Sequence, residues 1–180
     1  MRRGWLCLLW LALCALPACA EELSVCYHYG CDQISTIEVG EETLGWMNRR
    51  LLDAASADEE RAALQDVVLA YYQLAAQTTP IAADRAGNHE DARILGRMDC
   101  VDHSRNIDQL LELLDAHHWL HYHHVAGIVY RAPLLLDQHF AVGLDNIDSA
   151  EHWVIDSWPR DFGAPPLVVP LALWKEGFSP

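Results

Sequence analysis

The sequence is short of basic residues and, after its first twenty residues, of long apolar runs. It contains 12 Lys and Arg against 26 Asp and Glu, which gives a formal net charge of −14 at pH 7 with histidine neutral. Such an acidic chain repels nucleic acid and anionic lipid surfaces, so we expect no nucleic-acid partner. No later run could span a bilayer. Internal repeats and obvious linkers are also missing, which predicts a single domain over residues 21–180.

Residues 1–20 have the pattern of an export signal. Two arginines precede an apolar stretch over residues 5–16, and alanines at 18 and 20 form a small-residue cleavage pattern. The run Leu16-Pro17-Ala18-Cys19 also resembles a bacterial lipoprotein signal, in which Cys19 would carry the lipid. Both interpretations predict a mature protein in the periplasm or cell envelope, and in the lipoprotein interpretation the lipid on Cys19 is its only membrane attachment.

The cysteines leave one thiol without an obvious partner. Of six cysteines, Cys7 and Cys14 belong to the predicted signal, and Cys26 and Cys31 flank a short loop that an oxidising compartment would close as a disulfide. Cys100 is then unpaired, which fits either a reactive thiol or an inert buried cysteine.

The periodicity of apolar residues predicts helices first and strands afterwards. We expect a strand at 34–39, helices at 41–52, 56–76 and 99–116, a short helix at 91–95, and strands at 125–130, 135–144 and 152–158. This order indicates an α+β fold, with N-terminal helices packed on an antiparallel β-sheet.

Cys100 occupies a position that favours a thiolate. Asp99 is a good N-cap, so Cys100 opens its helix, where unpaired backbone N–H groups and the helix dipole stabilise negative charge. We therefore expect a lowered thiol pKa. Ile107 and Leu111 continue the same helix face, which places Cys100 at the edge of the core.

A histidine and an aspartate downstream complete the set that a thiol nucleophile needs. If 135–144 and 151–158 form a hairpin around the turn at 146–149, Gly143 pairs with His152 and His139 lies opposite Asp156. Directly opposed residues share a face with Cβ atoms about 4.5–5.5 Å apart, close enough for a carboxylate to hold an imidazole.

The neighbours of this pair fit the same hypothesis. Ala141 and Gly143 are small and lie on the face of His139, leaving room for the helix that carries Cys100. Trp158 follows Asp156 closely, and its indole would shield the ion pair from water.

These residues resemble the papain-like and transglutaminase-like thiol enzymes. The run Asp-Cys-Val-Asp at 99–102, a later histidine and Asp-Ser-Trp at 156–158 are similar to the bacterial transglutaminase-like cysteine proteinases over residues 90–160. The resemblance implies a transglutaminase-like fold, with Cys100 as nucleophile, His139 as base and Asp156 as the acid that orients the base.

Two further features follow from this resemblance. Some relatives bind calcium through acidic residues beside the cysteine, and Asp99 and Asp102 match two such positions, although they also suit a helix cap. The backbone N–H of Cys100 would supply one oxyanion donor. Asn88 and His89 are either a second donor or ordinary surface residues.

The expected activity is hydrolysis or acyl transfer at a peptide or amide bond of a substrate in the cell envelope, with no cofactor required. Two alternatives remain. The chain could be a non-catalytic envelope binding or scaffold protein that keeps this fold. It could instead be a metal-binding protein, because five histidines fall within residues 117–124. An exposed polar junction between helix and strand explains those histidines equally.

Overall fold

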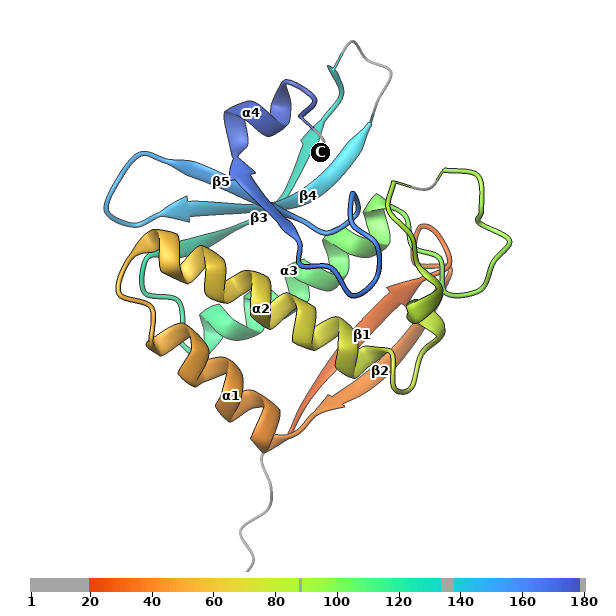
Figure 1. Ribbon diagram of the computed structural model, residues 1–180, viewed down its shortest axis with the longest axis horizontal. Coiled ribbons are helices and arrows are strands. Elements are labelled where there is room, and N and C mark those ends of the chain that lie inside the picture. The colour runs from red at the N-terminus through yellow and green to blue at the C-terminus, as the bar shows by residue number, and fades with distance from the viewer. Residues whose placement is uncertain (1–19, 88, 134–137, 179–180) are drawn as a thin grey trace, which may run out of the picture.

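The computed structural model describes residues 20–87, 89–133 and 138–178 (Figure 1). The predicted signal up to residue 19, with Cys19, lies outside the described residues. So do Asn88 and the first three residues of the strand predicted at 135–144.

The described elements confirm a mixture of helices and antiparallel strands. In chain order they are β1 (Glu21–Tyr27), β2 (Gln33–Val39), α1 (Glu41–Leu52), α2 (Ala57–Ala75), the 3₁₀ turn η1 (Pro80–Ala83), α3 (Cys100–Ala116), β3 (His123–Arg131), β4 (His139–Asn146), β5 (His152–Asp156), β6 (Leu167–Pro170) and α4 (Leu171–Lys175). The N-terminal helices and the later strands match the predicted order, and the coarse α+β prediction is therefore confirmed.

The strands form two antiparallel sheets rather than one. β1 pairs with β2 near the N-terminus, and β3, β4, β5 and β6 pair in that order in a four-stranded sheet. The prediction missed β1, because residues 21–27 lie directly after the predicted signal and were assigned to no element. It also missed β6 and α4, which follow the prolines after residue 158.

Helices α2 and α3 begin directly after their predicted capping residues, Ser56 and Asp99. Ser56 Oγ accepts the backbone N–H of Glu59 at 3.2 Å at the start of α2. The predicted short helix at 91–95 is wrong, because this segment consists of turns. Gly96 has φ +91°, and a Cβ there would lie 2.1 Å from the Pro80 carbonyl oxygen. Close packing of this segment on η1 therefore overrides its local helical pattern.

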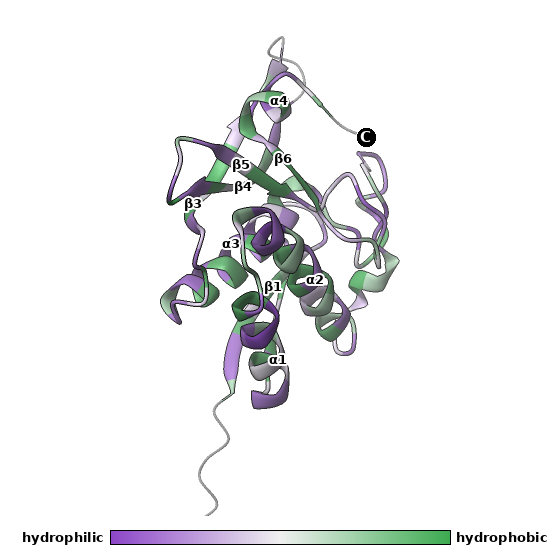
Figure 2. Ribbon diagram, turned by 60° about the vertical axis from the view of Figure 1, so that its left-hand side comes forward, coloured by the Kyte–Doolittle hydropathy of each residue, from purple (hydrophilic) through white to green (hydrophobic). Residues whose placement is uncertain are grey.

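Helix α3 lies in the middle of the molecule, between the two sheets. It contacts β1 on one side and β3 and β4 on the other (Figure 1). The main core joins apolar residues of α3 with Val142 and Leu144 of β4. α4 packs on β5 and β6, on the side of the four-stranded sheet away from α3 (Figure 2).

This arrangement corrects the expected packing around β4. Ala141 was expected to face the helix that carries Cys100, but it packs in a second cluster with Val154 and Trp174. Alternate residues of a strand point to opposite faces. Because α3 packs against Val142 and Leu144, Ala141 faces α4 instead.

Candidate functional site

Cys100 is the first residue of α3, as the sequence predicts. Asp99 Oδ1 accepts the backbone N–H groups of Val101 and Asp102, each at 3.0 Å. Asp102 in turn accepts the backbone N–H of Asp99 at 3.1 Å. This reciprocal capping box satisfies donors that an uncapped helix start leaves unpaired. The capping box therefore fixes the first turn of α3, which includes Cys100.

The same two carboxylates hold the disulfide loop against the helix start. Cys26 and Cys31 form the predicted disulfide. Asp102 accepts backbone N–H groups from Tyr29 at 2.8 Å and from Cys31, and Asp99 accepts that of Gly30 at 3.0 Å. Tyr29 and Cys31 have φ values of 60° and 59°, which are uncommon for residues other than glycine. The carboxylates therefore stabilise an unfavourable loop conformation directly beside Cys100.

The carboxylate oxygens of Asp99 and Asp102 are thus engaged by backbone N–H groups. Calcium needs six to eight oxygen ligands, and two carboxylates engaged by donors supply few of them. Within the described ranges, no group of three or more His, Cys, Asp or Glu side chains is arranged to hold a metal ion. Calcium binding near Asp99 and Asp102 remains a prediction.

The expected lowering of the Cys100 pKa is wrong. Partial burial raises the pKa of this thiol, and the negative charges of Asp99 and Asp156 raise it further. A hydrogen bond with the backbone of Phe140 lowers it but does not outweigh the burial. The helix N-terminus favours the thiolate, but desolvation disfavours the charged form and has the larger effect here.

His139 and Asp156 form a buried pair. His139 Nε2 lies 2.6 Å from Asp156 Oδ2, and the two residues are only 1% and 3% exposed. Each side chain satisfies a polar group that would otherwise be costly to bury. The predicted contact between these two residues is present.

The register that led to this prediction is nevertheless wrong by two residues. Gly143 pairs with Val154, not with His152. Because the shift is an even number of residues, His139 and Asp156 still share one face of the sheet, which is the face of Ala141 and Trp174. His139 and Asp156 are therefore diagonal neighbours across β4 and β5, and their side chains bridge the longer separation.

Two tryptophans enclose the pair. The Trp174 indole N–H donates to Asp156 Oδ2 at 3.0 Å, and the backbone N–H of Trp158 donates to Asp156 Oδ1 at 3.1 Å. The ring centroids of Trp158 and Trp174 lie 4.7 Å and 5.5 Å from that of His139. The predicted cover by Trp158 is confirmed. The role of Trp174 was missed, because it depends on how α4 folds back onto the sheet.

The second ring nitrogen of His139 makes no hydrogen bond within the described part of the chain. Nδ1 is buried and has no hydrogen-bond partner among the described residues. The neighbouring residue, Phe140, makes the backbone hydrogen bond to the Cys100 thiol. The start of β4 therefore carries the imidazole and contacts the thiol, without a direct hydrogen bond between Cys100 and His139 in the resting structure. Catalytic hydrogen bonds are often formed only with substrate bound.

A buried polar network links the helix of Cys100 to the strand end of Asp156. His103 Nδ1 lies 2.7 Å from Ser157 Oγ, and His103 Nε2 lies 3.0 Å from Asp84 Oδ2. The Tyr72 hydroxyl lies 3.1 Å from Ser157 Oγ. The sequence placed His103 three residues after Cys100, but nothing in its spacing indicated Asp84 or Tyr72 as partners.

Of the two predicted candidates for a second oxyanion donor, the structure describes only His89. Asn88 lies outside the described residues. His89 is exposed, and its ring centroid lies 4.9 Å from that of Trp158. His89 therefore lies at the edge of the tryptophan that covers His139, where it can be tested as a donor.

The histidine-rich segment is divided between core and surface. His123 is fully buried, with Nδ1 2.8 Å from Glu60 Oε2 and Nε2 3.0 Å from Arg61. His117, His121 and the other histidines of the run are exposed. Because of these buried contacts, we interpret His123 as a structural residue that anchors the start of β3.

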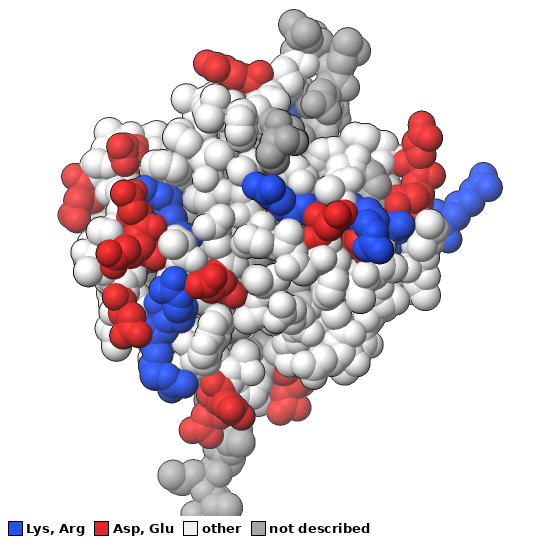
Figure 3. Space-filling model, in the orientation of Figure 1, with Lys and Arg blue, Asp and Glu red and all other residues white. Residues whose placement is uncertain are grey.

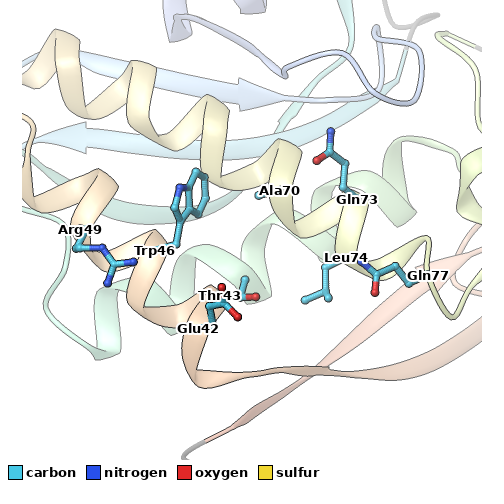
Figure 4. A pocket seen from close by; sticks show the side chains of 8 residues that line it. All are labelled: Glu42, Thr43, Trp46, Arg49, Ala70, Gln73, Leu74 and Gln77. Atoms are coloured by element: carbon cyan, nitrogen blue, oxygen red, sulfur yellow. The ribbon is translucent and has the colours of Figure 1, made fainter.

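Several hollows lie outside this buried network. A cavity of about 180 Å³ beside Cys100 is lined by Val101, Ser104, Arg105, Ile128 and Phe140. A wider groove runs between α1 and α2, with Trp46, Arg49 and Gln73 among its lining residues (Figure 4). The first of these is lined by Val101, the residue that follows Cys100 in the chain. On the face drawn in Figure 3, acidic side chains and arginines are interspersed.

A scan against protein-family models, a search of curated proteins and a search of solved structures each found no match. Among the helices in the described part of the chain, none is long and apolar enough to cross a membrane. The disulfide between Cys26 and Cys31 is compatible with an oxidising compartment. The site geometry therefore carries the functional argument.

Proposed function

We propose that this protein is an exported thiol hydrolase or acyltransferase with a transglutaminase-like fold, acting on peptide or amide bonds in the cell envelope. Cys100 is the nucleophile, His139 is the base, and Asp156 orients the imidazole. The observation that carries the proposal is the buried contact of 2.6 Å between His139 Nε2 and Asp156 Oδ2, with Nδ1 of the same ring left without a partner among the described residues.

The raised pKa of Cys100 determines how the first step proceeds. The resting thiol keeps its proton, so the proton passes to His139 Nδ1 as Sγ bonds to the substrate carbonyl carbon. The carbon–nitrogen bond then breaks, and the imidazolium gives the proton to the departing amine. This leaves a thioester on Cys100.

Water or an amine completes the reaction. His139 removes a proton from the attacking water, the carbon–sulfur bond breaks, and the proton returns to Sγ as the carboxylic acid leaves. An amine in place of water gives a new amide by the same steps. Asp156, held by Trp174 and by the backbone of Trp158, stabilises the imidazolium in both half-reactions.

A non-catalytic envelope binding or scaffold protein is the second candidate. The raised pKa of Cys100 favours it, because a protonated and half-buried thiol is a weak nucleophile. The missing hydrogen bond between Cys100 and His139 in the resting structure points in the same direction. The two candidates differ in whether Cys100 ever becomes acylated.

Product analysis separates these candidates. The folded protein and its Cys100→Ala variant are incubated with a defined mixture of synthetic peptides in heavy-oxygen water, with or without hydroxylamine as acceptor. The proposal predicts heavy oxygen in new C-termini, or hydroxamates with hydroxylamine, only when Cys100 is present. Equal products with both proteins, or no product with either acceptor, contradict the proposal.

A further inference from the structure

The cavity beside Cys100 is built from the same two elements that hold the candidate site. Val101, Ser104 and Arg105 follow Cys100 along the first turns of α3, and Phe140 follows His139 on β4. With a volume of about 180 Å³, the cavity suits a single side chain better than a whole ligand, because pockets for drug-sized ligands exceed about 300 Å³.

The cavity has apolar walls that continue onto the surface. Ile128 is 43% exposed, and Phe140 packs on Tyr130 with ring centroids 5.2 Å apart. Tyr130 is itself 45% exposed. An exposed apolar rim next to a half-buried thiol is the type of surface that contacts the stem of a substrate side chain.

Arg105 supplies the only formal charge among the described residues of this lining. It is exposed, and no acidic side chain lies within ion-pair distance of it among the described residues. Arg50, Arg61 and Arg97 each pair with an aspartate, whereas Arg49, like Arg105, forms no ion pair among the described residues. In a chain of net charge −14, an arginine without such a partner beside a nucleophile is well placed to bind a carboxylate from outside.

We propose that this cavity selects a peptide substrate in which a residue next to the cleaved bond is acidic, with its carboxylate on Arg105 and its methylene stem against Phe140 and Ile128. This inference deepens the proposed function and rests on it, because only an enzyme has a substrate. The binding of a small anion beside Cys100 can be tested without turnover.

Alkylation of Cys100 by a matched pair of reagents tests the anion preference directly. Iodoacetate and iodoacetamide react with thiols through the same displacement of iodide and differ in carrying a carboxylate or an amide. Rates of Cys100 labelling are measured on the folded protein by peptide mapping at one fixed pH. Each is divided by the rate of N-acetylcysteine with the same reagent.

The normalised preference for iodoacetate is expected to exceed one and to fall about two- to fivefold in Arg105→Gln, the range of exposed ion pairs. High salt should reduce it in the native protein as well. The matched control is Arg49→Gln, which removes the same charge from α1, and it should keep the preference. An unchanged preference in Arg105→Gln, or no labelling of Cys100 by either reagent, overturns the proposal.

Peptide cleavage separates this inference from the proposed function. Peptide pairs that differ only in Glu or Gln next to the bond should favour Glu, and Arg105→Gln should remove that selectivity. Cleavage of both members at equal rates by the native protein overturns the acidic specificity. If no peptide is cleaved while the iodoacetate preference depends on Arg105, the proposed hydrolase function fails and the anion-binding cavity stands.

Discussion

His103 Nδ1 lies 2.7 Å from Ser157 Oγ, and this contact joins the helix that begins at Cys100 to the strand that ends at Asp156. The two ends of the candidate site therefore belong to one buried network, which continues through His103 to Asp84 and through Ser157 to Tyr72. Buried networks whose members are all satisfied are rigid. Rigidity here fixes the position of Cys100 relative to Asp156.

Ser157→Ala should loosen this connection. The change leaves His103 Nδ1 and the Tyr72 hydroxyl without their shared partner, so the free energy of unfolding should fall by about 1–3 kcal/mol. Urea denaturation measures the fall. Ser149→Ala, in the exposed turn between β4 and β5, is the control and should change stability little. Equal stability of the two variants would contradict a structural role for the network.

Trp174→Phe tests the anchoring of Asp156. Phenylalanine keeps the apolar packing of α4 but cannot donate to Asp156 Oδ2, so about 1–3 kcal/mol of stability should be lost. The same change at Trp46, on the exposed side of α1, is the control. A chemical denaturation series in which Trp174→Phe matches Trp46→Phe would show that the indole hydrogen bond is unimportant.

The Cys100 thiol should respond to the charge of Asp156. Because that charge raises the thiol pKa, Asp156→Asn should lower the pKa and speed alkylation by iodoacetamide at neutral pH. In the native protein, labelling should increase as the pH rises beyond about 8.5, the ordinary cysteine value. Asp148→Asn, in an exposed turn, should leave the profile unchanged. A profile unaffected by Asp156→Asn would place Cys100 too far from the pair.

Asp102 gives the fold a defined pH dependence. Burial raises its pKa from 3.8 to about 6, and the charge of Asp99 adds to this effect. The folded state therefore binds this proton more tightly than the unfolded state. The resulting stabilisation is fully present below about pH 4 and is lost as the pH rises through about 6.

The Asp102→Asn variant isolates this contribution. The difference in unfolding free energy between native protein and variant should change between pH 4 and 6 and be flat at higher pH. Thermal or urea denaturation at a series of pH values measures this difference. A difference that stays constant across the window would mean that Asp102 titrates at its ordinary pKa.

The sequence predicted the parts of the fold that depend on local patterns. The capping residues Ser56 and Asp99 give the starts of α2 and α3, because N-capping involves only neighbouring residues. The periodicity of α3 likewise gave its buried face. Strand β1 and the turns at 91–95 were not predicted. Both depend on contacts with distant segments, and the periodicity of a segment carries no information about such contacts.

The candidate site was likewise predicted only in part. The contact of His139 with Asp156 survived a register error of two residues, because an even shift keeps both side chains on one face. The pKa of Cys100 was predicted with the wrong sign, because burial of the thiol follows from tertiary packing. Trp174 was missed for the same reason, as α4 reaches Asp156 only in the folded chain.

The most direct test of the account is acylation of Cys100 by p-nitrophenyl acetate, followed by nitrophenolate release and by mass spectrometry of the cysteine peptide. The account predicts that Cys100 becomes acetylated and that His139→Gln slows this step about 100-fold or more, because the thiol needs a base to remove its proton. Acetylation of Cys100 at the same rate in the native protein and in His139→Gln, with both folded, would contradict it.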